Sequence, residues 1–437
     1  MPLHADPLRL SLGQGPRTAR QLVEKLSLSQ PTLSRALMAL DDAVVRIGKG
    51  RAIQYALRDR SRGIDEIPVY RVTAEGTIRR LGMLVPVCPG GFVMHQEDGL
   101  SCHSDSLPWW LLDMRPQGFL GRAYAAHHAA TLGLPSQLNE WTDSHMLRAL
   151  LAHGHDVTGN LLLGDLARER CIDSPPPASV TPDDYPAHAA AAERGEVPGS
   201  SAGGEQPKFV TFTDRHVLVK FSSAEANPVA QRWRDLLLAE HIAAQVLLDA
   251  GIQAAHTRLF DRAGRRFLEI ERFDRVGQTG RRAVFSLASV EAEFVGAAHA
   301  PWPVLTTRLL AQDIITAEAA AGAARLHAFG TLIGNTDMHH GNLSFVSDGP
   351  PYALAPAYDM LPMAFRPLGS GVLSDDLPGA RLHPDVSSET WRQALDLAHE
   401  FLRRMNGDER FSGAWQACAH ALVQHVEEAR LKIARLD

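Results

Sequence analysis

Acidic and amide side chains in the last third of the chain have the spacing of a phosphoryl-transfer centre. Asp337 and Asn342 lie five positions apart in the sequence. In an Asp-x-x-x-x-Asn loop, the Asp can orient or deprotonate an acceptor hydroxyl and the Asn can reach back to a magnesium ion. Asp359 follows about twenty residues after Asp337, past a short apolar run at 343–346, where a second magnesium-binding carboxylate is expected. We therefore predict Asp337, Asn342 and Asp359 as catalytic residues, with Asn342 and Asp359 as metal ligands.

Ordinary explanations exist for several of these side chains. Asp359 could instead cap a helix that begins at Met360. His339 and His340 could be read as metal ligands, but the favoured interpretation makes His339 a buried residue that braces the loop and His340 a solvent-facing one. No HExxH or Cys/His ligand spacing supports a zinc site.

Two weaker signals precede this centre. The segment 200–208 is rich in small residues, whose backbone N–H groups can bind phosphate oxygens, although an ordinary surface loop has the same composition. Lys220 closes the apolar strand pattern 216–221 and could place its ammonium over nucleotide phosphates. Glu240, in an amphipathic helical pattern about twenty residues later, is equally explained as a partner of Lys220 or as a surface residue. These elements and the centre, in this order, are hard to obtain by chance.

The elements that must position this chemistry begin with a basic head. Residues 1–62 contain 11 Lys and Arg against five Asp and Glu, so their net charge is +6 and the other 375 residues carry −12. Helical patterns at 18–26 and 30–40, followed by a hairpin pattern at 44–57, predict a winged helix-turn-helix that binds double-stranded DNA. A small helical domain that packs against the body or a partner is the alternative. The predicted DNA-binding residues are Gln30, Thr32, Ser34, Arg35, Lys49 and Arg51.

Short β-branched runs between Gly and Pro turns at 68–116 predict a small sheet, and helical segments follow at 123–132 and 143–152. The Pro-rich stretch 174–186 is expected to be a loop or linker. The chain has 437 residues, enough for two to four domains, and its 45% apolar and 22% charged residues are typical of a soluble folded protein. Four cysteines without a CxxC spacing, together with no membrane span or signal peptide, predict a cytoplasmic protein.

Five strings resemble the HipA-like serine/threonine kinases of bacteria. They are SSAGGEQPKF at 200–209, VLVKF at 217–221, IERFDR at 270–275, GNTDMHHGNLSF at 334–345 and PAYDM at 356–360. Because a predicted DNA-binding head precedes them, the chain resembles the HipH (YjjJ-type) branch, in which such a domain is fused to the kinase.

This resemblance implies the α+β class and a two-lobed, protein-kinase-like fold distantly related to the phosphoinositide kinases, with an N-terminal winged helix-turn-helix domain. The implied domains are the head at 1–62, a β-rich subdomain at 63–175 and a kinase core at 176–437. Within the core, the N-lobe would end near residue 272 and the C-lobe would span 273–437.

The resemblance also implies a role for each matching residue. Asp337 would be the catalytic base, Lys220 the phosphate-binding lysine, and Glu271 with Phe273 the hinge that holds adenine. Ser201 falls where the family carries a regulatory serine, whose autophosphorylation ejects the loop and stops nucleotide binding. The implied ATP-binding residues are Lys220, Ser201, Gly203, Gly204, Gln206, Lys208, Glu271 and Phe273.

Two residues depart from the family pattern. Glu205 replaces a small or apolar residue, and its charge would weaken ATP binding unless it faces outward. Gly341 replaces a frequent Lys, which removes a cation near the transferred phosphate.

The implied function is an ATP- and Mg²⁺-dependent serine/threonine protein kinase acting as a toxin-like growth regulator. Its protein substrate would be, by family analogy, an aminoacyl-tRNA synthetase. A homodimer is a further expectation, because winged-helix readers often bind DNA as dimers. The alternatives are a DNA-binding transcriptional regulator with a nucleotide-sensing or degenerate kinase body, and a nucleic-acid-modifying enzyme.

Overall fold

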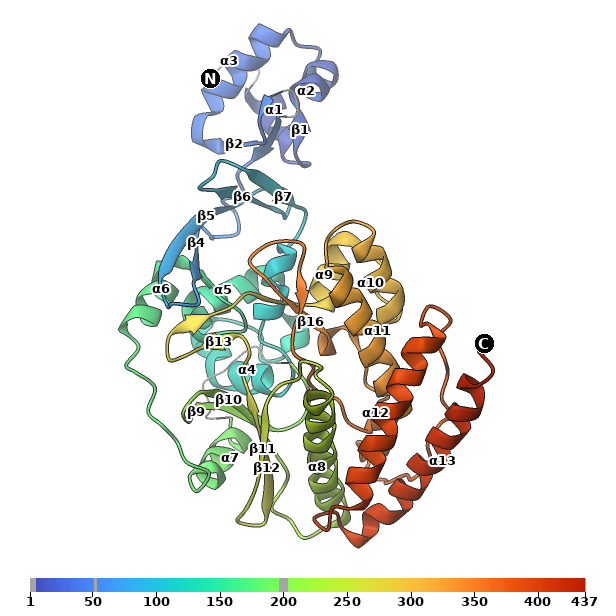
Figure 1. Cartoon of the computed structure of the whole chain (residues 1–437). Coiled ribbons are helices and arrows are strands. Elements are labelled where there is room, and N and C mark those ends of the chain that lie inside the picture. Colours follow the sequence, from blue (N-terminus) through green and yellow to red (C-terminus); the bar gives the residue numbers. More distant parts are fainter. Residues whose placement is uncertain (1–4, 51–52, 196–202, 437) are drawn as a thin grey trace.

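The computed structural model describes residues 5–50, 53–195 and 203–436, and it shows a mixed α/β architecture. A small head projects from one end, a β-rich unit lies next to it, and a larger two-lobed body follows (Figure 1). The C-terminal helices lie side by side along one flank of this body, away from the head. No described helix is long and apolar enough to cross a bilayer.

The head is a winged-helix fold in which helices pack on a three-stranded sheet of order β1-β3-β2. Its elements are α1 (Ala5–Leu12), β1 (Arg17–Thr18), α2 (Ala19–Leu26), α3 (Gln30–Leu40), β2 (Val44–Ile47) and β3 (Gln54–Leu57). Thr18 forms a capping box at the start of α2, and the Ser29 hydroxyl caps α3, as the sequence predicts for α3. The sequence analysis did not predict the helix α1.

The sheet of the head packs directly on the unit that follows it. We call this contact the head seam, and its buried residues are Val45, Ile47 and Ala56 from the head with Val85, Val87 and Val93 from the next unit. Backbone hydrogen bonds cross beside it, from the Cys88 N–H to the Leu57 carbonyl (2.8 Å) and from the Asp59 N–H to the Pro86 carbonyl (2.9 Å). The head is therefore held by apolar burial and hydrogen bonds rather than by a free linker.

The β-rich unit is a five-stranded antiparallel sheet of order β7-β6-β5-β4-β8, with helices beside it. Its strands are β4 (Ile67–Val72), β5 (Ile78–Pro86), β6 (Phe92–Gln96), β7 (Ser101–Ser104) and β8 (Leu161–Leu163). Its helices are the 3-10 helix η3 (Trp109–Met114), α4 (Gly118–Leu132), α5 (Asp143–His153) and α6 (Gly164–Asp173). The predicted sheet at 68–116 thus gains a fifth strand from beyond the two predicted helices.

The N-lobe of the body is a four-stranded antiparallel sheet of order β11-β12-β10-β9 with one long helix against it. Its elements are α7 (Tyr185–Glu193), β9 (Lys208–Phe212), β10 (His216–Phe221), α8 (Pro228–Asp249), β11 (Thr257–Arg262) and β12 (Arg265–Glu271). Asn227 caps α8 through the Ala230 N–H (2.8 Å), and Pro228 occupies its first turn. The predicted loop at 174–186 is largely irregular, but its last two residues belong to α7.

The C-lobe is mainly helical and contains the largest apolar core of the molecule. Its strands are β13 (Arg275–Val276), β14 (Gly280–Arg281), β15 (Val284–Ser286), β16 (Ser344–Val346) and β17 (Ala353–Leu354). Its helices are α9 (Leu287–Phe294), α10 (Trp302–Leu310), α11 (Ala317–Leu332), α12 (Ser388–Asn406) and α13 (Gln416–Ile433). Fully buried Phe329, Phe401 and Trp391 fix α11 against α12, so the loop after α11 emerges from a rigid base.

Candidate active site

Lys220 is the centre of a buried charge cluster at the end of β10. Its ammonium is 2.7 Å from a Glu240 carboxylate oxygen on α8 and forms an ion pair with Asp359. Antiparallel pairing of β9 with β10 places Lys208 directly across from Lys220. Two lysines and two carboxylates therefore meet with their formal charges balanced, which a buried cluster requires.

The pKa values of the cluster follow from burial and from these partners. Burial opposes the Lys220 ammonium, but the Asp359 and Glu240 carboxylates outweigh burial and raise the pKa of Lys220. Burial raises the pKa of Glu240, whereas Lys220 and Lys208 hold the pKa of Asp359 below its usual range despite burial. Of the two carboxylates, Asp359 is therefore the one whose charged form the site favours more strongly.

Lys208 is buried with only 3% of its surface exposed, and its ammonium donates to the Gly203 carbonyl. Burial lowers the pKa of Lys208 to about 8. The proximity of Lys220 acts in the same direction, while Asp359 and Glu240 act against it. Lys208 therefore titrates close to physiological pH.

The loop after α11 brings the other predicted acidic residues to the same region. Asn335 donates to the Asp359 carbonyl (3.1 Å) and accepts from the Asp337 N–H (3.0 Å), which ties the two acidic segments together. The Asn342 amide nitrogen donates to the Asp337 carbonyl (2.8 Å), so its amide oxygen is the atom that could bind a cation. Carboxylate and amide oxygens are ligands that Mg²⁺ prefers, so Asp359 and Asn342 fit that ion.

Asp359 is not a helix cap, because no helix begins at Met360 and the next one, the 3-10 helix η7 (Met363–Phe365), has Pro362 as its N-cap. Its φ of 55° lies in the left-handed region, which Asp adopts more readily than most residues but at some conformational cost. The histidine interpretation was also wrong. His339 is exposed, although its ring accepts from the Gly341 N–H (3.0 Å), and His340 is the more buried, with its ring 2.8 Å from the Ala300 carbonyl.

The predicted hinge lies where β12 ends. Glu271 pairs with Val217 on β10 and its carboxylate accepts from Arg215 (3.0 Å). The ring of Phe273 lies 5.8 Å from the Tyr358 ring, measured between centroids. Both rings border one cavity of about 480 Å³, a volume in the range of small-molecule sites.

This cavity collects most of the predicted nucleotide and metal residues. Those that line it are Gly203, Gly204, Lys208, Lys220, Glu271, Phe273, Asn342 and Asp359. Asp337 does not line it; its carboxylate lies 3.9 Å from Arg366 and is partly exposed. Gln206 is also outside the lining, and its amide nitrogen is buried without a partner in the described part of the chain. Ser201 lies outside the described residues.

The two departures from the family pattern have local explanations. Glu205 does not line the cavity but pairs with Arg122 on α4 (2.6 Å), although its charge is close enough to Lys208 to oppose the lowering of the pKa of that lysine. A Cβ at Gly341 would come within 2.8 Å of the His339 ring, so a larger residue here would require that ring to move. Gly204 also accepts from the Phe119 N–H (3.0 Å), so α4 holds this part of the loop.

Comparison with known proteins decides the family. Residues 200–429 match the HipA-like C-terminal domain, and residues 64–172 match the middle domain of the YjjJ-like toxins. Toxin YjjJ of Escherichia coli (strain K12) is 41% identical over 434 residues, covering 97% of this chain and 98% of that protein. The chain belongs to the HipA-like family. Its fold resembles that of HipA from Shewanella oneidensis MR-1, solved with HipB and operator DNA, at a TM-score of 0.51 and 14% identity over 84% of this chain and 97% of that one.

The HipA-like body also receives residues from the β-rich unit that the sequence analysis did not identify. Five residues of that unit line the cavity: Leu112, Asp113, Arg115, Gln117 and Thr158. Both carboxylate oxygens of Asp113 accept from Ser286, one from its N–H and one from its hydroxyl, at 2.6 Å each. No local spacing marks these positions, because their chemistry arises only when the unit folds against a segment more than a hundred residues away.

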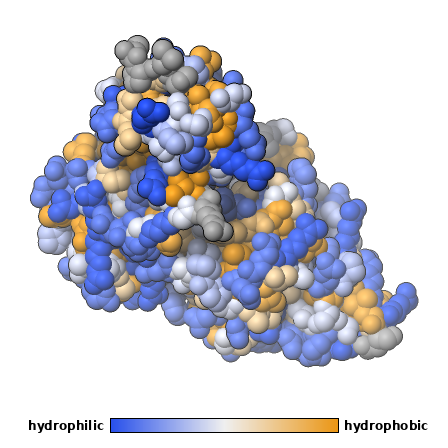
Figure 2. Space-filling model, turned by 90° about the horizontal axis from the view of Figure 1, so that it is seen from above, coloured by the Kyte–Doolittle hydropathy of each residue, from blue (hydrophilic) through white to orange (hydrophobic). Residues whose placement is uncertain are grey.

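The predicted DNA-binding residues of the head differ in how far they are exposed. Gln30, Ser34 and Arg35 are exposed on α3, while Thr32 is partly buried and its hydroxyl lies 2.8 Å from that of Ser29. Lys49 is exposed in the hairpin turn, close to Gly99 of the β-rich unit. Arg51 lies outside the described residues. Viewed onto the head, hydrophilic residues are interspersed with hydrophobic ones (Figure 2).

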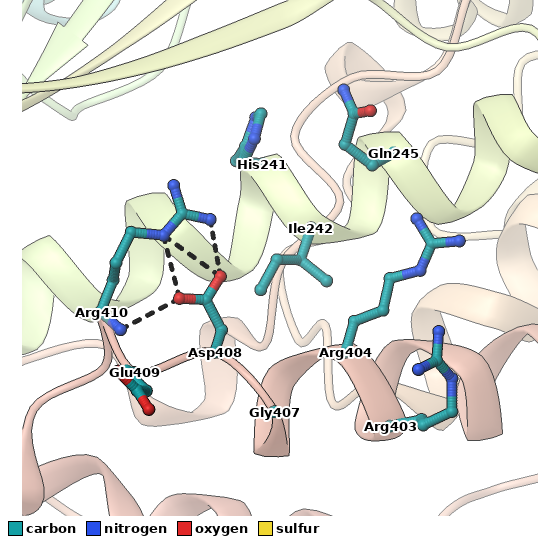
Figure 3. Close-up of a pocket in the computed structure, with 9 residues that line it drawn as sticks. All are labelled: His241, Ile242, Gln245, Arg403, Arg404, Gly407, Asp408, Glu409 and Arg410. Carbon is teal, nitrogen blue, oxygen red and sulfur yellow. Dashed lines mark hydrogen bonds and ion pairs between the residues drawn. The ribbon is translucent and has the colours of Figure 1, made fainter.

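A second cavity lies between α8 and α12, and none of the predicted site residues borders it (Figure 3). Its cations already have partners in the described chain. Arg410 pairs with Asp408 (2.6 Å), and Arg404 pairs with Asp249 (2.7 Å) and Glu400 (2.6 Å). This balance gives no reason to place nucleotide phosphates there.

Proposed function

We propose that this protein is a serine/threonine protein kinase that transfers the γ-phosphate of ATP to a protein, and that it acts as a toxin-like growth regulator. The observation that carries the proposal is the cluster of Lys220, Glu240 and Asp359 beside Asn342 in one cavity. A buried lysine paired with a carboxylate from a helix, next to an oxygen-rich cation site, is the arrangement that protein kinases use on nucleotide phosphates.

Each residue then has a physical task. Lys220 and Lys208 attract the phosphates, and Glu271 with Phe273 borders the adenine end. Asp359 and Asn342 would hold Mg²⁺, which neutralises charge on the transferred phosphate. Asp337, whose carbonyl accepts from the Asn342 amide, orients the acceptor hydroxyl and receives its proton.

The test is intact-mass analysis of the full chain after incubation with ATP and Mg²⁺. We expect one added phosphate on the wild type and none on Asp337→Asn, because that substitution removes the proton acceptor with little change of shape. Ser201→Ala should lose the mass gain if that serine is the modified residue. ATP binding without transfer would contradict the kinase assignment and favour a nucleotide sensor. Cleavage of nucleic acid that Asp359→Ala abolishes would favour the nucleic-acid-modifying alternative.

We also propose that α3 of the head binds double-stranded DNA. Support comes from exposed Gln30, Ser34 and Arg35 on one helix, from the +6 charge of the head, and from the relative that was solved with its operator DNA and HipB. Because the head is part of this chain, the protein would regulate its own operator without a separate DNA-binding partner.

Substitution is a cleaner test of DNA binding than removal of the head, because deletion would expose the buried valines of the head seam. We expect Arg35→Ala to weaken DNA binding and to reduce the slope of log affinity against log salt by about one. Arg403→Ala removes an equally exposed arginine from α12, far from the head, and should leave the affinity unchanged. Equal effects of the two variants, or a flat salt dependence, would contradict the proposal.

A further inference from the structure

A cysteine and a buried arginine meet between the β-rich unit and the kinase body. Cys171 lies near the end of α6 and is partly buried. Arg281 lies on β14, just after the hinge segment, with 9% of its surface exposed. The Arg281 Nη2 atom is 3.5 Å from the Cys171 sulfur and also donates to the His155 carbonyl (2.6 Å). In Figure 1, α6 and the neighbouring β13 lie on the same flank.

The guanidinium of Arg281 has more hydrogen-bonding capacity than its surroundings use. Its Nη1 atom is buried and finds no acceptor among the described residues. The nearby Asp156 carboxylate is 2.7 Å from Arg275 and therefore serves another cation. Burial, and then the neighbouring Arg275, lower the pKa of Arg281 to about 10. An unpaired donor of this kind is costly, and an anionic oxygen on the adjacent sulfur would satisfy it.

We propose that Cys171 is an oxidation site for hydroperoxides and that Arg281 stabilises its oxidised, anionic form. The Cys171 thiolate, having lost its proton to water, attacks one peroxide oxygen. An S–O bond forms, the O–O bond breaks, and hydroxide leaves. Sulfur is oxidised to a sulfenic acid while the peroxide is reduced, and the new oxygen, once deprotonated, accepts from Arg281.

The other cysteines provide internal controls, because no arginine donates to their sulfur in the described chain; Cys88 lies near Arg62, but burial raises the pKa of its thiol. Cys102 is exposed on β7, so access alone would make it the most reactive. Cys418 is fully buried, and burial followed by its contact with Asp375 raises the pKa of its thiol to about 12. If the guanidinium governs reactivity, Cys171 reacts before Cys102 despite being less accessible.

The experiment treats the full-length protein with limiting hydrogen peroxide, traps sulfenic acids with a cyclic 1,3-diketone, and locates the label by peptide mass spectrometry. We expect Cys171 to be labelled about tenfold faster than Cys102, the size of a charge-assisted contact. Arg281→Gln should slow labelling of Cys171 by a similar factor and leave Cys102 unchanged. Arg281→Lys retains the charge and should preserve most of the rate.

Two results would overturn the proposal. One is faster labelling of Cys102 than of Cys171 in the wild type, a comparison that depends on no variant. The other is an unchanged Cys171 rate in Arg281→Gln, which would separate its reactivity from the guanidinium.

Discussion

Glu240→Gln is the substitution that most directly tests the buried charge cluster. Glu240 is 4% exposed and lies 2.7 Å from Lys220, whose only other anionic partner among the described residues is Asp359. Removing one partner of a buried ion pair costs about 3–5 kcal/mol when the other charge is left alone. Because Asp359 remains and Gln keeps a hydrogen-bond acceptor, we expect a loss of about 2 kcal/mol.

A loss of about 2 kcal/mol in unfolding free energy lowers the thermal midpoint by about 4–8 °C in a domain of about 150–250 residues. Thermal unfolding of Glu240→Gln with and without Mg²⁺·ATP measures it. We also expect about tenfold weaker Mg²⁺·ATP binding. Without the Glu240 charge, Lys220 pairs more strongly with Asp359, and Asp359 is then less available to bind Mg²⁺. Glu427→Gln breaks an exposed pair with Arg430 and is the matched control, with no measurable loss. A Glu240→Gln protein with wild-type midpoint and affinity would refute the reasoning.

Three further predictions concern the rest of the site and the head. ATP affinity should fall as pH rises through about 8, where Lys208 loses its charge, and Lys208→Gln should remove that pH dependence. If the affinity of Lys208→Gln still falls near pH 8, another group causes the pH dependence. Val87→Asp buries a charge in the head seam and should release the head, which limited proteolysis would detect as cleavage near residue 62. Wild-type resistance to the protease would show that the seam does not hold the head. Gly118→Ala places a Cβ 2.4 Å from the Gly204 carbonyl and should weaken ATP binding about tenfold, while Gly90→Ala, which meets no atom, should not.

Local patterns predicted the parts of the fold that local physics specifies. Ser29 with Pro31 fixes the start of α3, and the apolar strand ending at Lys220 is β10. Lys220 and Glu240 are twenty residues apart. The sequence around each of them was equally consistent with an ion pair and with a surface glutamate. The pairing depends on how α8 packs against β10, which buries Glu240. Periodicity gives the face of a helix but not the neighbour that covers it.

Contacts between units were beyond the reach of sequence patterns. Arg122 neutralises Glu205, and Asp113 binds Ser286, yet neither pair has a spacing that marks it. The same limit applies to His339 and His340, whose burial was assigned in the wrong order. Adjacent residues on a loop differ in burial according to the segments around them, and the His340 ring lies against the Ala300 carbonyl and Glu291 of α9.

The head seam would relate the proposed DNA binding to the proposed phosphoryl transfer. A head on a free linker would bind DNA without any effect on the body, apart from raising its local concentration. Here Val45 and Ile47 of the head are buried against Val87, and Val87 follows the strand β5. After this sheet the chain continues into η3 and α4. The Phe119 N–H of α4 donates to the Gly204 carbonyl, and Gly204 lines the candidate cavity. Packed units of this kind move as bodies, so if the head binds DNA as proposed, an orientation that DNA selects would be shared by the sheet next to the 203–208 loop.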